Sequence, residues 1–259
     1  MGHIRLGKLP KTYRWQQVID LLEQAASIPE LAQAAFDAAQ RGLLRVPKDQ
    51  GFTQTLTTIF EFIDGLQSKD PVGGLRQKGF DIPNDATLFD YISSFKERAD
   101  AAVSGVRSRS DVAEIAQNSF TRTVFEGVAP SLPTFFGAAP GDVQKALQAD
   151  LKGQPLAKTM HEFFVTFTQQ YLNYYLSREL PYHVGQGKTL PNINSHSEFN
   201  DALDLYVRQT VRITDEFTPG WFGKARYEGR LSHESVARFA HVAFKKIRGE
   251  FSRDAEANE

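Results

Sequence analysis

The stretch PLAKTMHEFFVTFTQQYLNYYLSREL, residues 155–180, decides the fold class, because almost its whole circumference is apolar when it is wound as a helix. A proline begins the stretch, and Pro181 directly after it would end a helix. Around residues 160–178, five polar residues fall within one narrow strip, namely Glu162, Thr166, Gln169, Asn173 and Ser177. A helix with so little polar surface is normally buried within a bundle. We therefore predict a central buried helix, and we favour this role over the lining of a ligand cavity.

Hydrophobic residues recur at spacings of three and four along most of the remaining chain, which is typical of amphipathic helices. Ser27, Asp85, Asp111 and Ser232 stand where N-caps are expected. No segment shows a convincing strand pattern. We predict an all-α fold, an irregular bundle of about eight or nine helices around the central aromatic-rich helix. The expected helices cover residues 15–26, 28–44, 52–67, 86–103, 112–127, 140–152, 155–180, 198–217 and 233–251.

The length and composition are those of a globular protein: 259 residues, of which 41% are hydrophobic and 24% are charged. We predict a single helical domain over residues 19–253. The alternative is a division into two lobes near residues 69–84, because that connection is rich in Gly and Pro. Residues 1–18 form a basic arm that is expected to stay unstructured until it meets a partner. Residues 254–259 form an acidic tail.

The chain contains no cysteine, which excludes disulfides, metal sites built on thiolates and a cysteine nucleophile. The N-terminal residues lack the apolar core of a signal peptide. No run of eighteen apolar residues is present that could form a membrane-spanning helix. We therefore expect a soluble, cytoplasmic protein.

The formal net charge of −1 hides an uneven distribution along the chain. Residues 1–18 carry +4 and residues 222–253 carry +5, whereas the acidic tail carries −3 and the middle of the chain is acidic. If the fold brings the two basic segments together, their charges add into one patch that suits a polyanion such as nucleic acid.

The segment PGWFGKARYEGR, residues 219–230, interleaves aromatic and cationic side chains. Rings of this kind stack on unpaired bases while cations follow the phosphates, and Trp, Tyr and Arg are equally favoured as anchors in protein interfaces. A turn whose aromatic side chains fill the core explains the segment as well. The candidate binding residues are Arg5, Lys8, Lys11 and Arg14 near the N-terminus, and Trp221, Phe222, Lys224, Arg226, Tyr227 and Arg230 near the C-terminus.

The sequence GQGKT at residues 185–189 ends like a phosphate-binding loop, but Tyr182 stands where that motif needs its first glycine. A helix rather than a strand is expected before it, so we predict a glycine-rich connection and no bound ATP or GTP. The pairs His161-Glu162 and His233-Glu234 lack the second histidine of a metalloprotease motif. We expect no metal and no cofactor.

The segment 124–141 contains only one charged residue and is rich in Gly and Pro. We interpret it as a buried crossover between two parts of the bundle. The alternative is that Phe135 and Phe136 insert into a partner groove or a bilayer surface.

These observations favour a non-catalytic helical binding or assembly subunit of a larger complex. It would contact a polyanion, such as nucleic acid, or an acidic protein partner through the basic and aromatic segments near both termini. The alternative is a hydrolase whose acids and histidines come from several helices. A deep pocket with converging acids and histidines would favour the enzyme, whereas an open basic groove would favour binding.

Overall fold

The computed structural model describes residues 3–24, 26–106, 108–133, 138–183, 185, 190 and 193–257. For residues 193, 196 and 251–257 it describes the backbone only. Within these ranges the chain forms eleven α-helices, three short 3-10 helices and an isolated β-bridge, with no sheet. The all-α prediction is therefore confirmed.

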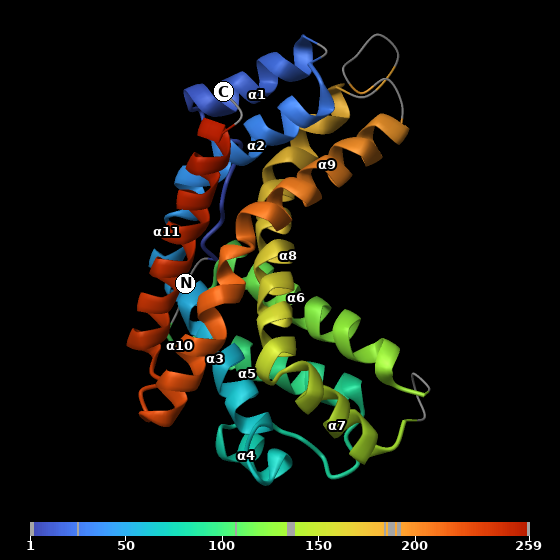
Figure 1. The fold of residues 1–259 in the computed structure, drawn as a ribbon, viewed down its shortest axis with the longest axis vertical. Coiled ribbons are helices and arrows are strands. Elements are labelled where there is room, and N and C mark those ends of the chain that lie inside the picture. Colours follow the sequence, from blue (N-terminus) through green and yellow to red (C-terminus); the bar gives the residue numbers. More distant parts are fainter. Residues whose placement is uncertain are drawn as a thin grey trace.

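The α-helices follow one another along the chain as shown in Figure 1. They are α1 (Tyr13–Glu23), α2 (Ile28–Leu43), α3 (Gln50–Leu66), α4 (Pro71–Gln77), α5 (Leu88–Gly105), α6 (Asp111–Val128), α7 (Pro140–Asp150), α8 (Gly153–Glu179), α9 (Ile193–Val211), α10 (Ile213–Tyr227) and α11 (His233–Ala257). The 3-10 helices are η1 (Val46–Lys48), η2 (Ala129–Ser131) and η3 (Leu180–His183).

The described part of the chain has more helices than the eight or nine expected, because two helices occupy segments that were interpreted as connections. One is α4, which lies in the Gly- and Pro-rich connection. The other is α10, which spans most of residues 219–230 and contains Pro219 in its interior. An interior proline removes one backbone hydrogen bond, but α10 packs against α8 and α11 and buries Phe222 against Phe60 of α3. Tertiary packing therefore overrides the local signal.

The helix ends differ from the expected ones by a few residues. Thr87 caps α5 in place of Asp85, in a capping box with Asp90. Ser110 caps α6 in place of Asp111, and its hydroxyl accepts the Ala113 N–H at 3.0 Å. A hydroxyl cap followed by an acid in the first turn is a favoured N-terminus. The predicted cap Ser27 is confirmed, whereas α9 begins at residue 193, before the expected start at residue 198.

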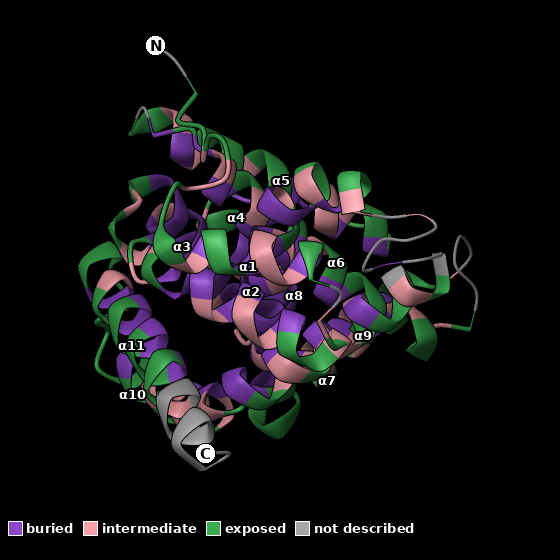
Figure 2. Ribbon diagram, turned by 90° about the horizontal axis from the view of Figure 1, so that it is seen from above, coloured by how far each residue is buried: buried purple, intermediate pink, exposed green. Residues whose placement is uncertain are grey.

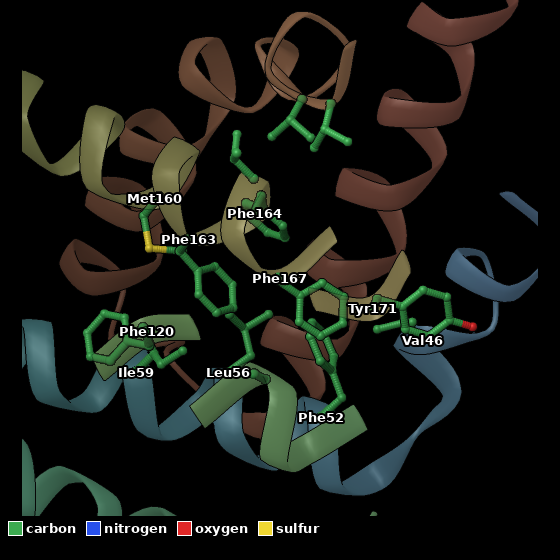
Figure 3. Packing of buried hydrophobic residues seen from close by; sticks show 14 of the residues in the cluster. Val46, Phe52, Leu56, Ile59, Phe120, Met160, Phe163, Phe164, Phe167 and Tyr171 are labelled. Carbon is green, nitrogen blue, oxygen red and sulfur yellow. The ribbon is translucent and has the colours of Figure 1, made fainter. Parts of the chain in front are cut away.

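The long helix α8 packs against α2, α6, α7, α9 and α10. In Figure 1 it runs along the molecule, with α1, α2 and α9 toward one end and α4, α5 and α7 toward the other. Phe163, Phe164 and Phe167 are fully buried on it. Figure 3 shows Phe167 facing Phe52 of α3, and their ring centroids are 5.1 Å apart.

The buried hydrophobic residues form one cluster with members on both sides of the connection at residues 69–84. Phe80, within that connection, packs against Phe62 of α3, which in turn contacts Phe95 of α5 and Phe120 of α6. In Figure 2 the buried residues face inward between the helices, and the exposed residues face outward. No helix in the described residues is both long and apolar enough to cross a membrane.

Residues 3–12, which we call the strap, lie along the helical body instead of projecting from it. The Ile4 N–H donates to the Arg109 carbonyl at 2.8 Å, and the Asp111 N–H donates to the Ile4 carbonyl at 2.9 Å. The Arg178 guanidinium donates to the Gly7 carbonyl at 2.8 Å. Helix α1 then begins at Tyr13. These contacts replace the unstructured arm expected from the sequence.

Candidate anion-binding pocket

A pocket of about 640 Å³ lies where the strap meets the start of α1, the end of α2 and the tyrosines of α8. Its volume falls within the range of small-molecule sites. Four arginines line it, namely Arg5, Arg14, Arg41 and Arg45. We call it the arginine pocket.

Three of the four arginines have no carboxylate partner among the described residues. Arg14 donates to the Asp37 carboxylate at 2.5 Å and to its carbonyl at 3.2 Å. Arg5, Arg41 and Arg45 are exposed at the pocket, and none of them has an ion pair within the described ranges. Their charges are therefore available to a ligand.

Asp49 is the acidic residue among the side chains that line the pocket, and it is engaged in structure. Its Oδ1 atom accepts the Phe52 N–H at 2.7 Å, as the N-cap of α3, and the Ser110 hydroxyl at 2.9 Å. The lining therefore keeps a positive net charge.

Aromatic side chains form the apolar wall of the pocket. Trp15 and Tyr175 are buried with ring centroids 5.6 Å apart, and Tyr171 contacts Tyr175 edge to face. Burial raises the pKa of Tyr171, and the neighbouring Tyr175 hydroxyl raises it further. Burial also raises the pKa of Tyr175. Both hydroxyls therefore stay protonated at neutral pH and can donate hydrogen bonds.

The end of α2 shapes the pocket because its residues there are small. Ala38, Ala39 and Gly42 all line it. A Cβ atom at Gly42 would collide with the Tyr171 hydroxyl, so only glycine admits that ring at its present position. Arg41 lies in the last turn of α2, and Arg45 follows the end of this helix, directly before η1.

The predicted N-terminal binding residues are partly assembled in this pocket. Arg5 and Arg14 line it, whereas Lys8 and Lys11 are exposed on the strap outside the lining. Sequence reasoning missed Arg41, Arg45 and the two tyrosines. The sequence does contain two arginines four residues apart, with a glycine between them, at the end of an alanine-rich helix. That local pattern does not show that these arginines lie beside the N-terminal segment.

Two of the three aromatic residues predicted near the C-terminus, Trp221 and Phe222, pack against rings of the core. Phe222 is buried and stacks on Phe60, with ring centroids 5.5 Å apart. Trp221 lies 4.3 Å from the Phe239 ring and 4.9 Å from the Phe60 ring, again between centroids. Core filling therefore describes the positions of Trp221 and Phe222, and contact of this segment with a partner stays a prediction.

Of the cations predicted near the C-terminus, two are paired with acidic side chains and one is exposed. Arg226 donates to the Asp64 carboxylate at 2.5 Å and to the Gln67 carbonyl at 2.9 Å. Arg230 forms an ion pair with Glu228. Lys224 and Tyr227 are exposed, and Tyr227 has 92% of its surface accessible.

The candidate cations at residues 224–230 lie away from the strap. The strap pairs with the start of α6, where Ser110 contacts Asp49 at the beginning of α3, whereas Arg226 contacts Asp64 near the end of α3. A helix rises 1.5 Å per residue, so Asp49 and Asp64 are about 22 Å apart. Figure 2 shows the N-terminal end and the α10–α11 pair on different sides of the molecule.

Acids and histidines meet at two other places. His161 Nδ1 lies 3.1 Å from Asp215 Oδ1, and burial raises the pKa of Asp215. Within the described ranges, His3, Asp111 and Glu114 have ligand atoms within 4.8 Å of one another and form a group that could hold a metal ion. However, Asp111 already accepts the Leu6 N–H at 2.9 Å and a hydrogen bond from Tyr174. Neither group lines the arginine pocket.

The glycine loop lies largely outside the described residues, whereas all of segment 124–141 except residues 134–137 is described. Gly187, Lys188 and Thr189 of the glycine loop are outside the described residues, although the Gly185 N–H donates to the Leu190 carbonyl at 2.9 Å.

In segment 124–141, Val124 and Val128 are buried, but most of the other described residues of that segment are exposed, so the interpretation of it as a buried crossover is wrong. Phe135 and Phe136 lie outside the described residues.

We expect Trp221→Ala to destabilise the fold by about 2 kcal/mol, because the ring packs on two phenylalanines while remaining half-buried. Tyr227→Ala, at an exposed position in the same helix, is the control and should change stability by less than about 0.5 kcal/mol. Urea denaturation followed by circular dichroism measures both. Equal effects of the two substitutions would show that Trp221 is not part of the core.

The chain matches no protein-family model, and comparisons with curated proteins and with solved structures give no significant match.

Proposed function

We propose that the protein is a non-catalytic binding protein and that the arginine pocket is its binding site. Its ligand carries negative charge on an apolar body, either as a small molecule or as an acidic group presented by a partner of a larger assembly. One observation carries the proposal. Three arginines without carboxylate partners among the described residues line a pocket whose wall is aromatic.

The chemistry of arginine supports an anionic ligand. The guanidinium group donates two parallel hydrogen bonds to a carboxylate or phosphate, and such charge-assisted bonds are among the strongest in proteins. An arginine that is already paired must lose its partner before it binds a ligand, and Arg5, Arg41 and Arg45 have no such partner in the described part of the chain. The aromatic wall adds the apolar contact that small-molecule sites use for affinity.

The shape of the site supports a single acidic group over a nucleic-acid strand. A strand needs a groove with cations along its length and rings open to the bases, whereas Trp221 and Phe222 pack in the core and lie near the far end of α3. The hydrolase alternative has less support, because Asp49, the acid of the pocket lining, is engaged as a helix cap.

We expect the protein to bind anilinonaphthalene sulfonate, a fluorescent dye with one negative charge on an aromatic body. Replacing Arg41 and Arg45 together by Gln should weaken this binding about tenfold or more, because each charged hydrogen bond contributes about 1.5–3 kcal/mol. Fluorescence titration measures the dissociation constants.

Arg122→Gln is the matched control, because Arg122 is an exposed arginine on α6 that pairs with Glu126 and does not line the pocket. The uncharged dye phenylnaphthylamine tests the contribution of the charge. Equal binding of both dyes, together with no effect of the Arg41 and Arg45 substitutions, would refute the proposal.

A further inference from the structure

We infer that the natural ligand of the arginine pocket is a phosphate monoester of an apolar body. This inference rests on the proposed function and adds the chemical class of the anion. It is carried by three features that meet at the pocket: the number of unpaired charges, the start of α1 and the volume left for the rest of the ligand.

The net positive charge of the pocket lining favours a ligand with two negative charges. Arg5, Arg41 and Arg45 are unpaired within the described residues, Asp49 is the acid of the lining, and Arg14 is compensated by Asp37. The pocket therefore has an excess of two positive charges. A carboxylate or sulfonate supplies one negative charge, whereas a phosphate monoester supplies about 1.5 to 2 at pH 7.

The first turn of α1 adds a second preference for phosphate. Thr12, Tyr13 and Arg14 all line the pocket, so the amino end of this eleven-residue helix faces it. The first N–H groups of a helix and its dipole favour anions, and phosphate in particular. The Thr12 hydroxyl accepts the Trp15 N–H at 3.4 Å, and α1 has no acidic residue in its first turn that would compete for the remaining groups.

The size of the pocket requires more than the phosphate itself. A cavity of about 640 Å³ holds a drug-sized molecule, whereas the arginines and the start of α1 occupy only part of its lining. Trp15, Tyr175 and Val112 supply the apolar remainder. An organic group attached to the phosphate would fill this space.

Isothermal titration calorimetry with naphthyl phosphate and naphthalene sulfonate tests the inference, because the two compounds share one body and differ in charge. At about pH 7.5 we expect naphthyl phosphate to bind at least tenfold more tightly. The second pKa of a phosphate monoester is about 6, so this preference should largely disappear at about pH 5. The sulfonate keeps its charge throughout and reports any change in the protein itself.

Arg45→Gln should reduce the preference for phosphate over sulfonate at about pH 7.5, whereas Arg122→Gln should leave it unchanged. Circular dichroism confirms that each variant is folded. Decyl phosphate, compared with naphthyl phosphate, distinguishes a lipid-like source from an aromatic one, and tight binding of either supports the inference.

Equal affinities for phosphate and sulfonate, or a preference that persists at about pH 5, would overturn the dianion inference and leave the proposed function intact. Binding of neither anion would overturn both.

Discussion

Phe167→Ala is expected to lower the free energy of unfolding by about 3–5 kcal/mol, the range for removing a fully buried aromatic ring. Phe167 has no accessible surface, and its ring contacts Phe52 of α3, Phe244 of α11 and Tyr171 of α8. Figure 3 shows the Phe167 ring beside those of Phe52 and Tyr171. The substitution leaves a cavity where α3, α8 and α11 meet, and these helices cannot move together far enough to close it. Chemical denaturation followed by circular dichroism measures the loss.

Phe89→Ala is the matched control, since Phe89 lies on α5 with 71% of its surface exposed. We expect it to change stability by less than about 0.5 kcal/mol. Phe167→Leu should cost less than Phe167→Ala, because the larger side chain leaves a smaller cavity. A loss of under 1 kcal/mol for Phe167→Ala would mean that α3, α8 and α11 do not pack as described.

Gly51→Ala is expected to destabilise the protein by about 3 kcal/mol, at the upper end of the cost of adding one methyl group to a packed site. The added Cβ would collide with the Ser108 carbonyl oxygen and lie 2.9 Å from the Ala113 Cβ. A backbone carbonyl cannot rotate away as a flexible side chain can. The start of α3 would therefore have to move away from the start of α6. Thermal unfolding followed by circular dichroism measures the effect.

Gly141→Ala provides the comparison, because nothing lies within 4 Å of the Cβ position at this exposed helical glycine in α7. There we expect stabilisation by about 0.4–1 kcal/mol, since alanine reduces the conformational entropy of the unfolded chain. If Gly51→Ala were as mild as Gly141→Ala, the close approach of α3 to residues 108–113 would be wrong. The strap pairs with residues 109–111, and Asp49 contacts Ser110. A shift of α3 away from residues 108–113 would therefore disturb the arginine pocket as well, so Gly51→Ala should also weaken dye binding.

The helical class and most helix positions could be predicted because they depend on residues a few positions apart. Helix α3 was expected over residues 52–67 and spans Gln50–Leu66, since its apolar residues repeat at the period of one turn. The caps of α5 and α6 were misplaced by one or two residues, because neighbouring Ser, Thr and Asp residues are all good N-caps.

Local rules were wrong where packing outweighs them. The expected helix ended at residue 217 and residues 219–230 were interpreted as a possible turn, yet α10 continues through Pro219, where Thr218 and Phe222 are buried beside it. The sequence also could not assign Trp221, because an aromatic residue next to cations has the same local pattern whether it faces the core or a partner. Only the positions of Phe60 and Phe239 decide between the two.

The sequence by itself determined that the described chain is helical, where most helices lie and that no thiol chemistry is available. Which cations share a site was decided by the tertiary structure alone. Arg5 and Arg45 are forty residues apart in the chain and meet at one pocket, whereas Arg5 and Arg226, equally basic, lie near opposite ends of α3. The physical reason is that helix formation depends on short-range spacing, but a binding site depends on which helices pack together, and that is set by the buried faces of the whole chain.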